Sequence, residues 1–362
     1  MTDESYIKLA IEVAKKGQGN VSPNPLVGCV IIKNEKIIGA GYHEKYGENH
    51  AEINAIESSN ESVEGATLFV NLEPCSHFGK TPPCVDKIIE KKIKRVVIGT
   101  LDMNPIVSGR GIKRLKAAGI DVKVGILEKE CAELNKFFFK YITKKVPYVT
   151  LKAAQTLDGK IADKNGNSKW ISSTMSRKIV HQMRSRYDAI MVGSGTIEKD
   201  NPRLTVRYIE GRNPKRIILD THLKLKINYK IFNNNSDGNL IVITSVNNRK
   251  KQSKIERLRS LGIQVLFANE NKKGLIDLRS ALIEIGKINI SSLLVEGGSI
   301  LYSSFMKSNL YDDITLFIAP KILGSGTDTF EDMGIKSVQK ANRLKIDSLE
   351  KIGDDIMVQL SK

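Results

Sequence analysis

Residues 72–84 have the sequence LEPCSHFGKTPPC, and the chain reads His50-Ala51-Glu52 shortly before them. Together these segments supply one imidazole, His50, and two thiols, Cys75 and Cys84. Nitrogen and sulfur donors suit the tetrahedral preference of Zn²⁺, and three protein ligands leave a fourth position open for water. Glu52 stands beside this group without being needed as a ligand, so it is the candidate proton shuttle. The pattern therefore predicts a catalytic zinc site.

The spacing also constrains the local structure of this site. Residues two apart point to different faces in the middle of a helix, so His50 and Glu52 can face one metal only in a first turn. Asn49 is the predicted N-cap of that helix. Cys84 follows Pro82-Pro83 at another predicted helix start, where the helix dipole favours a thiolate. We expect two helix N-termini to converge on one cation.

The order of these residues favours hydrolytic chemistry over a structural role. Bound zinc lowers the pKa of water from ~15.7 towards ~7 and so provides a nucleophile at neutral pH. A His-x-Glu segment followed by Pro-Cys is the pattern of zinc-dependent deaminases. The alternative is a closed structural zinc site, which would need a fourth ligand, and His77 is the nearby candidate.

Composition places the chain among ordinary globular proteins. It has 362 residues, of which 41% are hydrophobic and 27% charged, so wholesale disorder is excluded. No run approaches the ~20 apolar residues of a membrane span. The first ten residues, MTDESYIKLA, are acidic and lack the pattern of a secretory signal, so we expect a cytoplasmic protein. Cys29 and Cys131 lie in apolar segments, and we expect them to be buried and reduced.

The chain is strongly basic, with 57 Lys and Arg against 40 Asp and Glu and a net charge of +17. Such an excess raises the hypothesis of a nucleic-acid partner. The excess is uneven, since residues 1–146 carry +4 and residues 147–362 carry +13. The charge therefore belongs mainly to the second part of the chain and leaves the zinc-bearing part nearly balanced.

Hydrophobic periodicity predicts alternating helices and strands in residues 1–145. Residues 34–35 form a short turn that predicts a hairpin, and residues 128–141 are predicted as one closing helix. Strands are expected at 26–33, 36–42, 66–72, 95–100 and 122–126, and other helices at 5–16, 50–59, 82–92 and 111–118. Short apolar strands interleaved with helices predict a three-layer α/β/α sandwich.

A charged, Pro-containing connector at residues 144–147 predicts a domain boundary, after which the alternation starts again. We therefore expect a second α/β domain at residues 146–362. Its expected strands are 148–154, 189–193, 216–220, 240–244, 264–267, 292–296, 313–319 and 355–360, and its expected helices are 175–186, 250–261, 275–285 and one from Ser299.

Several segments resemble the bifunctional deaminase–reductase family of riboflavin biosynthesis. They include residues 23–28 (PNPLVG), the two zinc segments, residues 109–111 and residues 147–152, and the resemblance continues into the second domain. The long gap between Cys75 and Cys84 separates this family from cytidine and tRNA-adenosine deaminases, where the gap is usually two residues. The chain departs from the family pattern at Ser22, where His is usual, and at Met103, where Pro is usual.

The resemblance implies a cytidine-deaminase-like first domain with zinc held by His50, Cys75 and Cys84 and with Glu52 as proton donor. The implied substrate is 2,5-diamino-6-ribosylamino-4(3H)-pyrimidinone 5′-phosphate, which loses its 2-amino group as ammonia. By position, the implied substrate contacts are Asn24, His77, Lys80 and Asn104.

The second domain lacks the Gly-x-Gly-x-x-Gly pattern of a standard dinucleotide site. Two glycine turns, at residues 193–196 and 297–299, each follow an expected strand and could cradle a phosphate. The resemblance implies a dihydrofolate-reductase-like domain that uses NADPH to reduce the ribosyl group to ribityl. Most of the basic excess lies in this domain, where the resemblance places two anionic ligands.

Residues of the second domain are assigned by position from the resemblance. NADPH is expected to contact Ala154, Trp170, Thr196, Asp200, Thr221, Gly298, Ser299, Ile300, Leu301, Tyr302, Ser303 and Ser304. Substrate is expected to contact Ser168, Arg184, Leu204, Arg207 and Glu296. Apart from the resemblance, Lys152 is a candidate substrate contact that would polarise or protonate the ring-opened sugar. Arginine forks suit a sugar phosphate, whereas Trp170, the single tryptophan, could instead be a core residue.

Two rival readings remain open from the sequence. A nucleic-acid deaminase would explain the charge and the zinc pattern but would leave the second domain without a need for NADPH. A structural zinc module joined to a nucleotide sensor would bind NADPH without turnover. The family resemblance instead implies small-molecule ligands, no nucleic acid, no membrane and a homo-oligomer of two or four copies.

Overall fold

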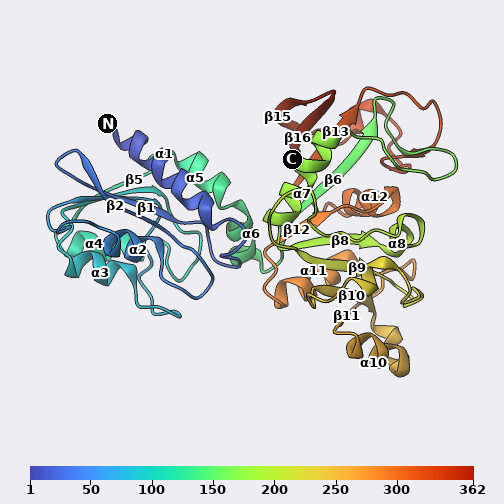
Figure 1. Ribbon diagram of the computed structural model, residues 1–362, viewed down its shortest axis with the longest axis horizontal. Helices are drawn as coiled ribbons and strands as arrows, with labels where there is room; N and C mark the ends of the chain where they lie inside the picture. The colour runs from blue at the N-terminus through green and yellow to red at the C-terminus, as the bar shows by residue number, and fades with distance from the viewer. The chain divides into compact units, whose positions relative to one another are not determined.

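The computed structural model describes all 362 residues, which form two compact units, Met1–Lys145 and Val146–Lys362 (Figure 1). Each unit has a sheet and hydrophobic clusters of its own. No helix of the chain is both long enough and apolar enough to cross a membrane.

The first unit is built on a five-stranded sheet with the order β2-β1-β3-β4-β5. Asn34 and Glu35 both have positive φ (48° and 65°), which matches the twist that a two-residue hairpin needs. This turn pairs the first two strands antiparallel, while β3, β4 and β5 run parallel. The strands are β1 (Gly28–Lys33), β2 (Lys36–Tyr42), β3 (Thr67–Leu72), β4 (Arg95–Thr100) and β5 (Asp121–Val124).

Helices cover both faces of this sheet because its strands alternate two apolar faces. Along β1, Cys29 and Ile31 pack into one cluster with the second, third and fourth helices, and Val30 and Ile32 pack into another with the first and fifth. Figure 1 shows the strands between these two sets of helices. The helices are α1 (Asp3–Ala14), the 3₁₀ turn η1 (Lys15–Gly17), α2 (Ala51–Glu57), α3 (Cys84–Glu90), α4 (Arg110–Ala117), α5 (Glu128–Leu134) and α6 (Lys136–Lys144). The expected three-layer sandwich is confirmed.

The expected single helix over residues 128–141 is wrong, since the chain breaks at Asn135 between α5 and α6. Asn135 is buried, and its side chain forms hydrogen bonds with the backbone of Leu26, which lies just before β1. Its Oδ1 accepts the Leu26 N–H at 2.8 Å, and its Nδ2 donates to the Leu26 carbonyl at 3.0 Å. A long-range pair of hydrogen bonds therefore overrides the helical periodicity of this segment.

The second unit is built on a nine-stranded sheet with the order β11-β10-β9-β8-β12-β6-β13-β16-β15. The seven strands from β11 to β13 in this order are parallel, and the last two are antiparallel. Its strands are β6 (Tyr148–Thr156), β8 (Ala189–Gly193), β9 (Lys215–Leu219), β10 (Leu240–Ser245), β11 (Gln264–Ala268), β12 (Ser292–Val295), β13 (Asp313–Ala319), β15 (Lys345–Ile352) and β16 (Asp355–Ser361), and β7 (Lys160–Ala162) pairs separately with β14 (Thr327–Asp328).

Helices again cover both faces of the sheet. Along β8, Ala189 and Met191 pack with the helices that follow β11 and β12, whereas Ile190 and Val192 face the opposite cluster. The helices are α7 (Thr174–Arg186), α8 (Ser194–Asp200), α9 (Lys230–Asn233), α10 (Gln252–Ser260), α11 (Leu278–Lys287) and α12 (Ser299–Lys307), with 3₁₀ turns η2 (Val246–Lys250) and η3 (Val338–Lys340).

Some helices and strands of this unit were not predicted from the sequence because they lack a periodic apolar face. Strand β15 is exposed along most of its length and reads KIDSLEKI, a mixed charged pattern. It forms a strand because it pairs with β16, from Lys345 opposite Ser361 to Ile352 opposite Asp355. Helix α8 was expected only as a turn, and β7, β14 and α9 were not expected at all.

Replacing Asn135 tests the contact that breaks the closing helix. Asn135→Ala leaves the Leu26 N–H without its partner and removes one of the two donors to the Leu26 carbonyl, which keeps the hydrogen bond from Asn71 Nδ2. We therefore expect the free energy of unfolding of the first unit to fall by about 1–3 kcal/mol. All four cysteines lie in this unit, so labelling of the buried Cys29 and Cys131 in urea follows its unfolding alone. The exposed Asn60→Ala is the control and should change this value by less than about 0.5 kcal/mol. An equal effect of both variants contradicts the prediction.

Candidate active sites

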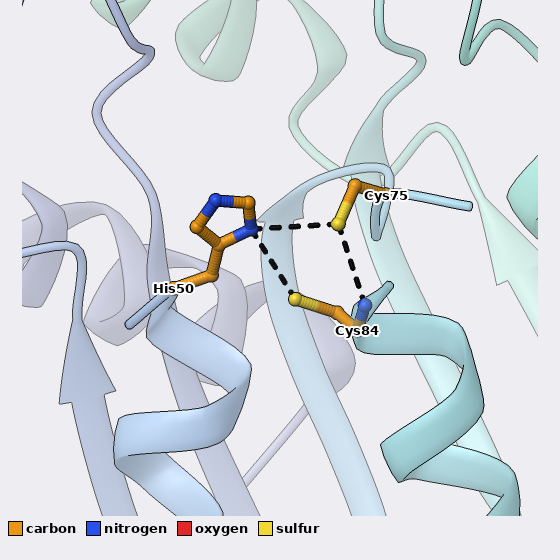
Figure 2. A group of neighbouring side chains, drawn as sticks. All are labelled: His50, Cys75 and Cys84. Atoms are coloured by element: carbon orange, nitrogen blue, oxygen red, sulfur yellow. Dashed lines mark hydrogen bonds between the residues drawn. The ribbon is translucent and has the colours of Figure 1, made fainter. Parts of the chain in front are cut away.

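Three side chains from separate elements of the first unit face one another. His50 Nδ1 lies 3.4 Å from Cys75 Sγ and 3.3 Å from Cys84 Sγ (Figure 2). One ligand atom from each residue lies within 4.8 Å of the other two. Figure 2 shows the imidazole and both thiols pointing toward the same space. The sequence pattern therefore corresponds to a real cluster of donor atoms.

His50 occupies a helix terminus, as its spacing from Glu52 requires. Helix α2 begins at Ala51, so His50 itself is the N-cap, with an extended backbone, and Glu52 lies in the first turn. The expectation that Asn49 caps this helix is wrong. The Asn49 side chain instead donates to Glu57, and its carbonyl accepts a hydrogen bond from His43 Nδ1 at 2.9 Å.

The two cysteines are brought together by a strand end and a helix start. Cys75 follows β3, and Cys84 is the first residue of α3. The Cys84 N–H donates to Cys75 Sγ at 3.3 Å, and the Val85 N–H donates to the Cys75 carbonyl. Hydrogen bonds from Cys84 and His50 lower the pKa of Cys75. The nearby Cys75 sulfur and burial raise the pKa of Cys84. The surroundings of Cys75 thus favour the thiolate, which is the form of cysteine that binds metal.

This donor set fits zinc. One imidazole nitrogen and two sulfurs are borderline-soft ligands, and the three atoms are close enough together to share one ion. His77 does not join the group, so the closed four-ligand alternative finds no support here. Its Nδ1 is instead buried without a hydrogen-bond partner.

A cavity of about 260 Å³ opens beside the cluster. Its lining includes the ligand candidates His50 and Cys75, the carboxyl of Glu52, and the four expected substrate contacts Asn24, His77, Lys80 and Asn104. Lys80 Nζ lies 4.0 Å from the centre of the Tyr46 ring, also on this wall. The residues singled out in the first domain are therefore gathered at one place.

Glu52 lines this cavity and is 3% exposed. Burial is the main reason that the pKa of its carboxyl is raised to about 6. A carboxyl that exchanges its proton near neutral pH and lines the cavity suits general acid–base work.

His43 is a site residue that sequence reasoning missed. Its Nδ1 donates to the Asn49 carbonyl, so its Nε2 is left to accept from the Asn24 amide at 3.1 Å. Burial lowers the pKa of His43, in keeping with this neutral form. The hydrogen bond holds the Asn24 amino group, which leaves Asn24 Oδ1 available as an acceptor in the cavity. The sequence feature that could have indicated His43 is its position as a polar residue directly after the predicted strand 36–42.

In the second unit, charged residues gather at the carboxyl edge of the parallel strands. Glu296 follows β12 and accepts two hydrogen bonds from the Arg184 guanidinium, both at 2.8 Å. Lys152 Nζ of β6 lies 4.0 Å from Glu296 Oε2. Burial lowers the pKa of Lys152, whereas the two cations hold the pKa of Glu296 at about 2 despite its burial.

A second guanidinium lies beside this pair. Arg184 and Arg207 both donate to the Thr205 carbonyl, at 3.2 and 3.3 Å. The Arg207 N–H donates to His181 Nδ1 at 2.9 Å, and burial and the two arginines lower the pKa of His181 to about 4. Only one carboxylate, Glu296, balances this group within the contacts described, so the cations favour an added anion.

The two glycine turns lie side by side. Gly193 and Gly298 are the N-caps of α8 and α12, and a Cβ at Gly298 would lie 3.8 Å from Thr196 Oγ1. The adjacent parallel strands β8 and β12 bring the turns together at the carboxyl edge. In open α/β sheets, ligands bind at this edge.

The structure places the other expected contacts of the second unit in loops, on β6, on α8 and on α12, where some of their side chains already have hydrogen-bond partners. Ser168 donates to Asp200 at 3.2 Å, and Trp170 is 61% exposed with the Arg177 guanidinium 4.5 Å from its ring centre, so the core alternative for Trp170 is wrong. Ala154 lies on β6, Ile300 and Ser304 lie on α12, and Thr221 accepts from the Ile276 N–H.

Several residues that were expected to contact NADPH or substrate have buried side chains. Leu204 is 4% exposed and packs in the same cluster as Ile190 and Val192 of β8, so its side chain is not available to a ligand. Tyr302 Oη donates to the Lys152 carbonyl at 2.5 Å, and Ser303 Oγ accepts from the Glu331 N–H. Leu301 and Ser299 are also buried.

Family models match both parts of the chain. Residues 1–100 match the cytidine and deoxycytidylate deaminase zinc-binding region, and residues 147–358 match the RibD C-terminal domain. The riboflavin biosynthesis protein RibD of Aquifex aeolicus is 46% identical over 98% of this chain and 97% of its own length. That of Actinobacillus pleuropneumoniae is 43% identical over 99% of this chain and 95% of its own.

Solved structures agree over the full length. The Thermotoga maritima diaminohydroxyphosphoribosylaminopyrimidine deaminase/5-amino-6-(5-phosphoribosylamino)uracil reductase is 42% identical, with a TM-score of 0.88 over 99% of this chain and 98% of that one. Fold and site together define an enzyme with a zinc-binding, cytidine-deaminase-like domain followed by a reductase domain. The chain belongs to the RibD family of bifunctional riboflavin deaminase/reductases.

The Glu296–Arg184 pair generates a pH prediction. The pKa of Glu296 is lowered to about 2, so the pair stabilises the second unit above the ordinary carboxyl range and loses this contribution as pH falls from about 4.5 towards 2. We expect Glu296→Gln to lower the free energy of unfolding by about 3–5 kcal/mol at pH 7, because Arg184 is left buried without its partner. The variant should also lose less stability than the parent between pH 4.5 and 2.

Urea unfolding followed by the fluorescence of Trp170, the single tryptophan, measures this stability in the full chain. Glu284→Gln is the control, since its partner Lys287 is 63% exposed. If both variants follow the parent's acid profile, the prediction is contradicted.

Proposed function

We propose that residues 1–145 deaminate 2,5-diamino-6-ribosylamino-4(3H)-pyrimidinone 5′-phosphate and that residues 146–362 then reduce its ribosyl group to ribityl with NADPH. The observation that carries the proposal is the cluster of His50, Cys75 and Cys84 beside a cavity whose lining includes His50, Cys75 and the buried Glu52. The similarity to the Thermotoga maritima diaminohydroxyphosphoribosylaminopyrimidine deaminase/5-amino-6-(5-phosphoribosylamino)uracil reductase supports the choice of substrate class.

In the deaminase step, His50 Nδ1 and the two thiolates would hold zinc. When bound, zinc lowers the pKa of a water molecule and so supplies a nucleophile at neutral pH. The Glu52 carboxyl takes up a proton at one oxygen and delivers it to the departing amino group, which leaves as ammonia. Asn24, oriented by His43, accepts a hydrogen bond from an N–H of the pyrimidine.

In the reductase step, NADPH would lie along the carboxyl edge of the second sheet. The paired glycine turns and Thr196 suit its phosphates, because backbone N–H groups at helix starts attract anions and glycine permits close approach. Trp170 offers an exposed ring at this edge. Hydride transfer is the cofactor's own chemistry, so these residues chiefly position it against ribose C1′.

The sugar phosphate would bind at the two guanidiniums. Arg207 is exposed and anchored through its backbone to His181, so its side chain can reach an anion, while Arg184 is fixed by Glu296. Lys152, which lies 4.0 Å from Glu296, and Ser168, which donates to Asp200, would complete the substrate contacts. The family resemblance also leads us to expect a cytoplasmic homo-oligomer of two or four copies. Light scattering of the purified protein measures the number of copies.

Glu52→Gln tests the deaminase assignment. The amide keeps the shape of the carboxyl but cannot carry the proton, so we expect ammonia release from the diaminopyrimidine substrate to fall ~10³-fold. Zinc content and NADPH oxidation with the deaminated product should stay unchanged. Glu57→Gln, the same change on the exposed face of the same helix, is the control. Ammonia release within threefold of the parent would show that Glu52 is not the proton donor.

Arg207→Ala tests the phosphate contact of the reductase. Loss of a charge-assisted hydrogen bond of about 1.5–3 kcal/mol should raise the KM for the deaminated substrate ten- to a hundredfold. The dissociation constant for NADPH and the rate of ammonia release should not change. Arg257→Ala, on the exposed face of α10, is the matched control. A higher NADPH dissociation constant at unchanged substrate KM would move Arg207 to the cofactor site instead.

A further inference from the structure

Glu73 is a buried carboxylate for which the proposed chemistry has no use. It follows β3 directly, stands two residues before Cys75, and is 3% exposed. Its backbone N–H donates to the Thr100 carbonyl at the end of β4, which fixes its place between two parallel strands. A carboxylate buried at this depth needs donors to compensate its lost hydration.

Those donors are backbone N–H groups from one loop. Glu73 Oε2 accepts from Gly109 at 2.9 Å and from Asp102 at 3.4 Å, and Oε1 accepts from Gly111 at 3.1 Å. Asp102 and Gly111 stand at opposite ends of the segment 102–111. A single side chain therefore fastens both ends of this loop to the segment that carries Cys75.

The far end of the loop is the start of α4. Gly109 is the N-cap of this helix and has φ of 73° and no side chain to cap it. The first N–H groups of a helix lack partners within the helix, and a carboxylate there also meets the positive end of the helix dipole. Glu73 thus caps α4 from a neighbouring strand. A Cβ at Gly111 would lie 2.4 Å from the Pro74 carbonyl oxygen, so glycine is what permits this close approach.

Between its fastened ends, the loop forms part of the cavity wall. Asp102, Asn104 and Val107 line the cavity beside the zinc-ligand candidates. Asp102 Oδ1 accepts from the Asn104 N–H at 2.7 Å, and Asn104 Oδ1 accepts from the Ile106 N–H at 3.2 Å. The wall is internally tied, so its distance from Cys75 depends on how its ends are held.

We propose that Glu73 is a positioning residue for deamination: its carboxylate clamps the 102–111 loop and so sets the affinity of the cavity for the pyrimidine. The inference rests on the proposed deaminase function and adds a residue that does not itself touch the substrate. Because Asp102 and Asn104 lie on the clamped loop, loosening it weakens substrate binding more than the chemical step.

Glu73→Gln tests the clamp in the full-length, zinc-loaded chain. The amide keeps the side-chain shape but presents an NH₂ group to a backbone N–H, so donor faces donor. We expect the KM for the diaminopyrimidine substrate to rise at least tenfold, with kcat changed less than threefold. Zinc content and NADPH-dependent reduction of the deaminated product stay at parental values. Glu128→Gln, an exposed carboxylate in the first turn of α5, is the matched control and changes none of these.

Amide hydrogen exchange reports on the clamp without any substrate. In Glu73→Gln, amides of the peptide spanning residues 102–111 should exchange at least tenfold faster, while those of β3 and β4 keep their protection. Exchange does not depend on which molecule binds, so it separates the two proposals. Absence of ammonia release by the parent protein would overturn the proposed function and leave the clamp to be decided by exchange.

Glu73→Asp covers the case in which the glutamine variant loses zinc. It keeps the charge on a shorter arm, so we expect retained zinc, an intermediate KM and intermediate exchange. The proposal is overturned by a parental KM or parental loop exchange in Glu73→Gln, or by a fall in kcat at unchanged KM. Zinc loss in both variants also overturns it, since Glu73 would then organise the metal pocket itself.

Discussion

Parallel strand pairing is the constraint on which both sites of this protein depend. Parallel strands place all of their carboxyl ends at one edge, so residues that follow different strands meet there however far apart they are in sequence. In the first unit, Cys75 follows β3 and Asp102 follows β4. In the second, Lys152 on β6 reaches Glu296 beyond β12. The helices that begin at these edges add N–H groups and set the remaining ligands.

The two sites gather charged and polar groups that suit ligands of opposite sign. The first gathers an imidazole, two cysteine sulfurs and the carboxyl of Glu52 around a space that suits a cation. The second gathers Arg184, Arg207 and Lys152 around one carboxylate, which leaves a surplus that suits an anion. The overall charge of +17 does not reveal this difference, because it counts every charged side chain of the chain alike.

Much of this could be predicted because the relevant signals are local. The His50–Glu52 spacing required a first helical turn, and α2 begins at Ala51. Periodicity located β2 and β4 at their observed ends. Predictions failed where a distant partner decided the outcome: Asn135 leaves its helix for Leu26, Asn49 yields the cap position to His50, and β15 exists because β16 pairs with it. His43 and Glu73 were missed because each acts through residues remote in sequence.

The sequence by itself determined the chemistry available to this protein: the ligand types, their order along the chain, the two alternating α/β patterns and the family resemblance. Tertiary structure alone decided which of those groups act together. Residue type and spacing are carried by neighbouring positions, whereas orientation depends on contacts closed across the sheet. Asn24 presents its oxygen because His43 holds its amino group, and the loop of Asn104 stands where Glu73 fastens it. Such hydrogen bonds form only after the strands that carry them have paired.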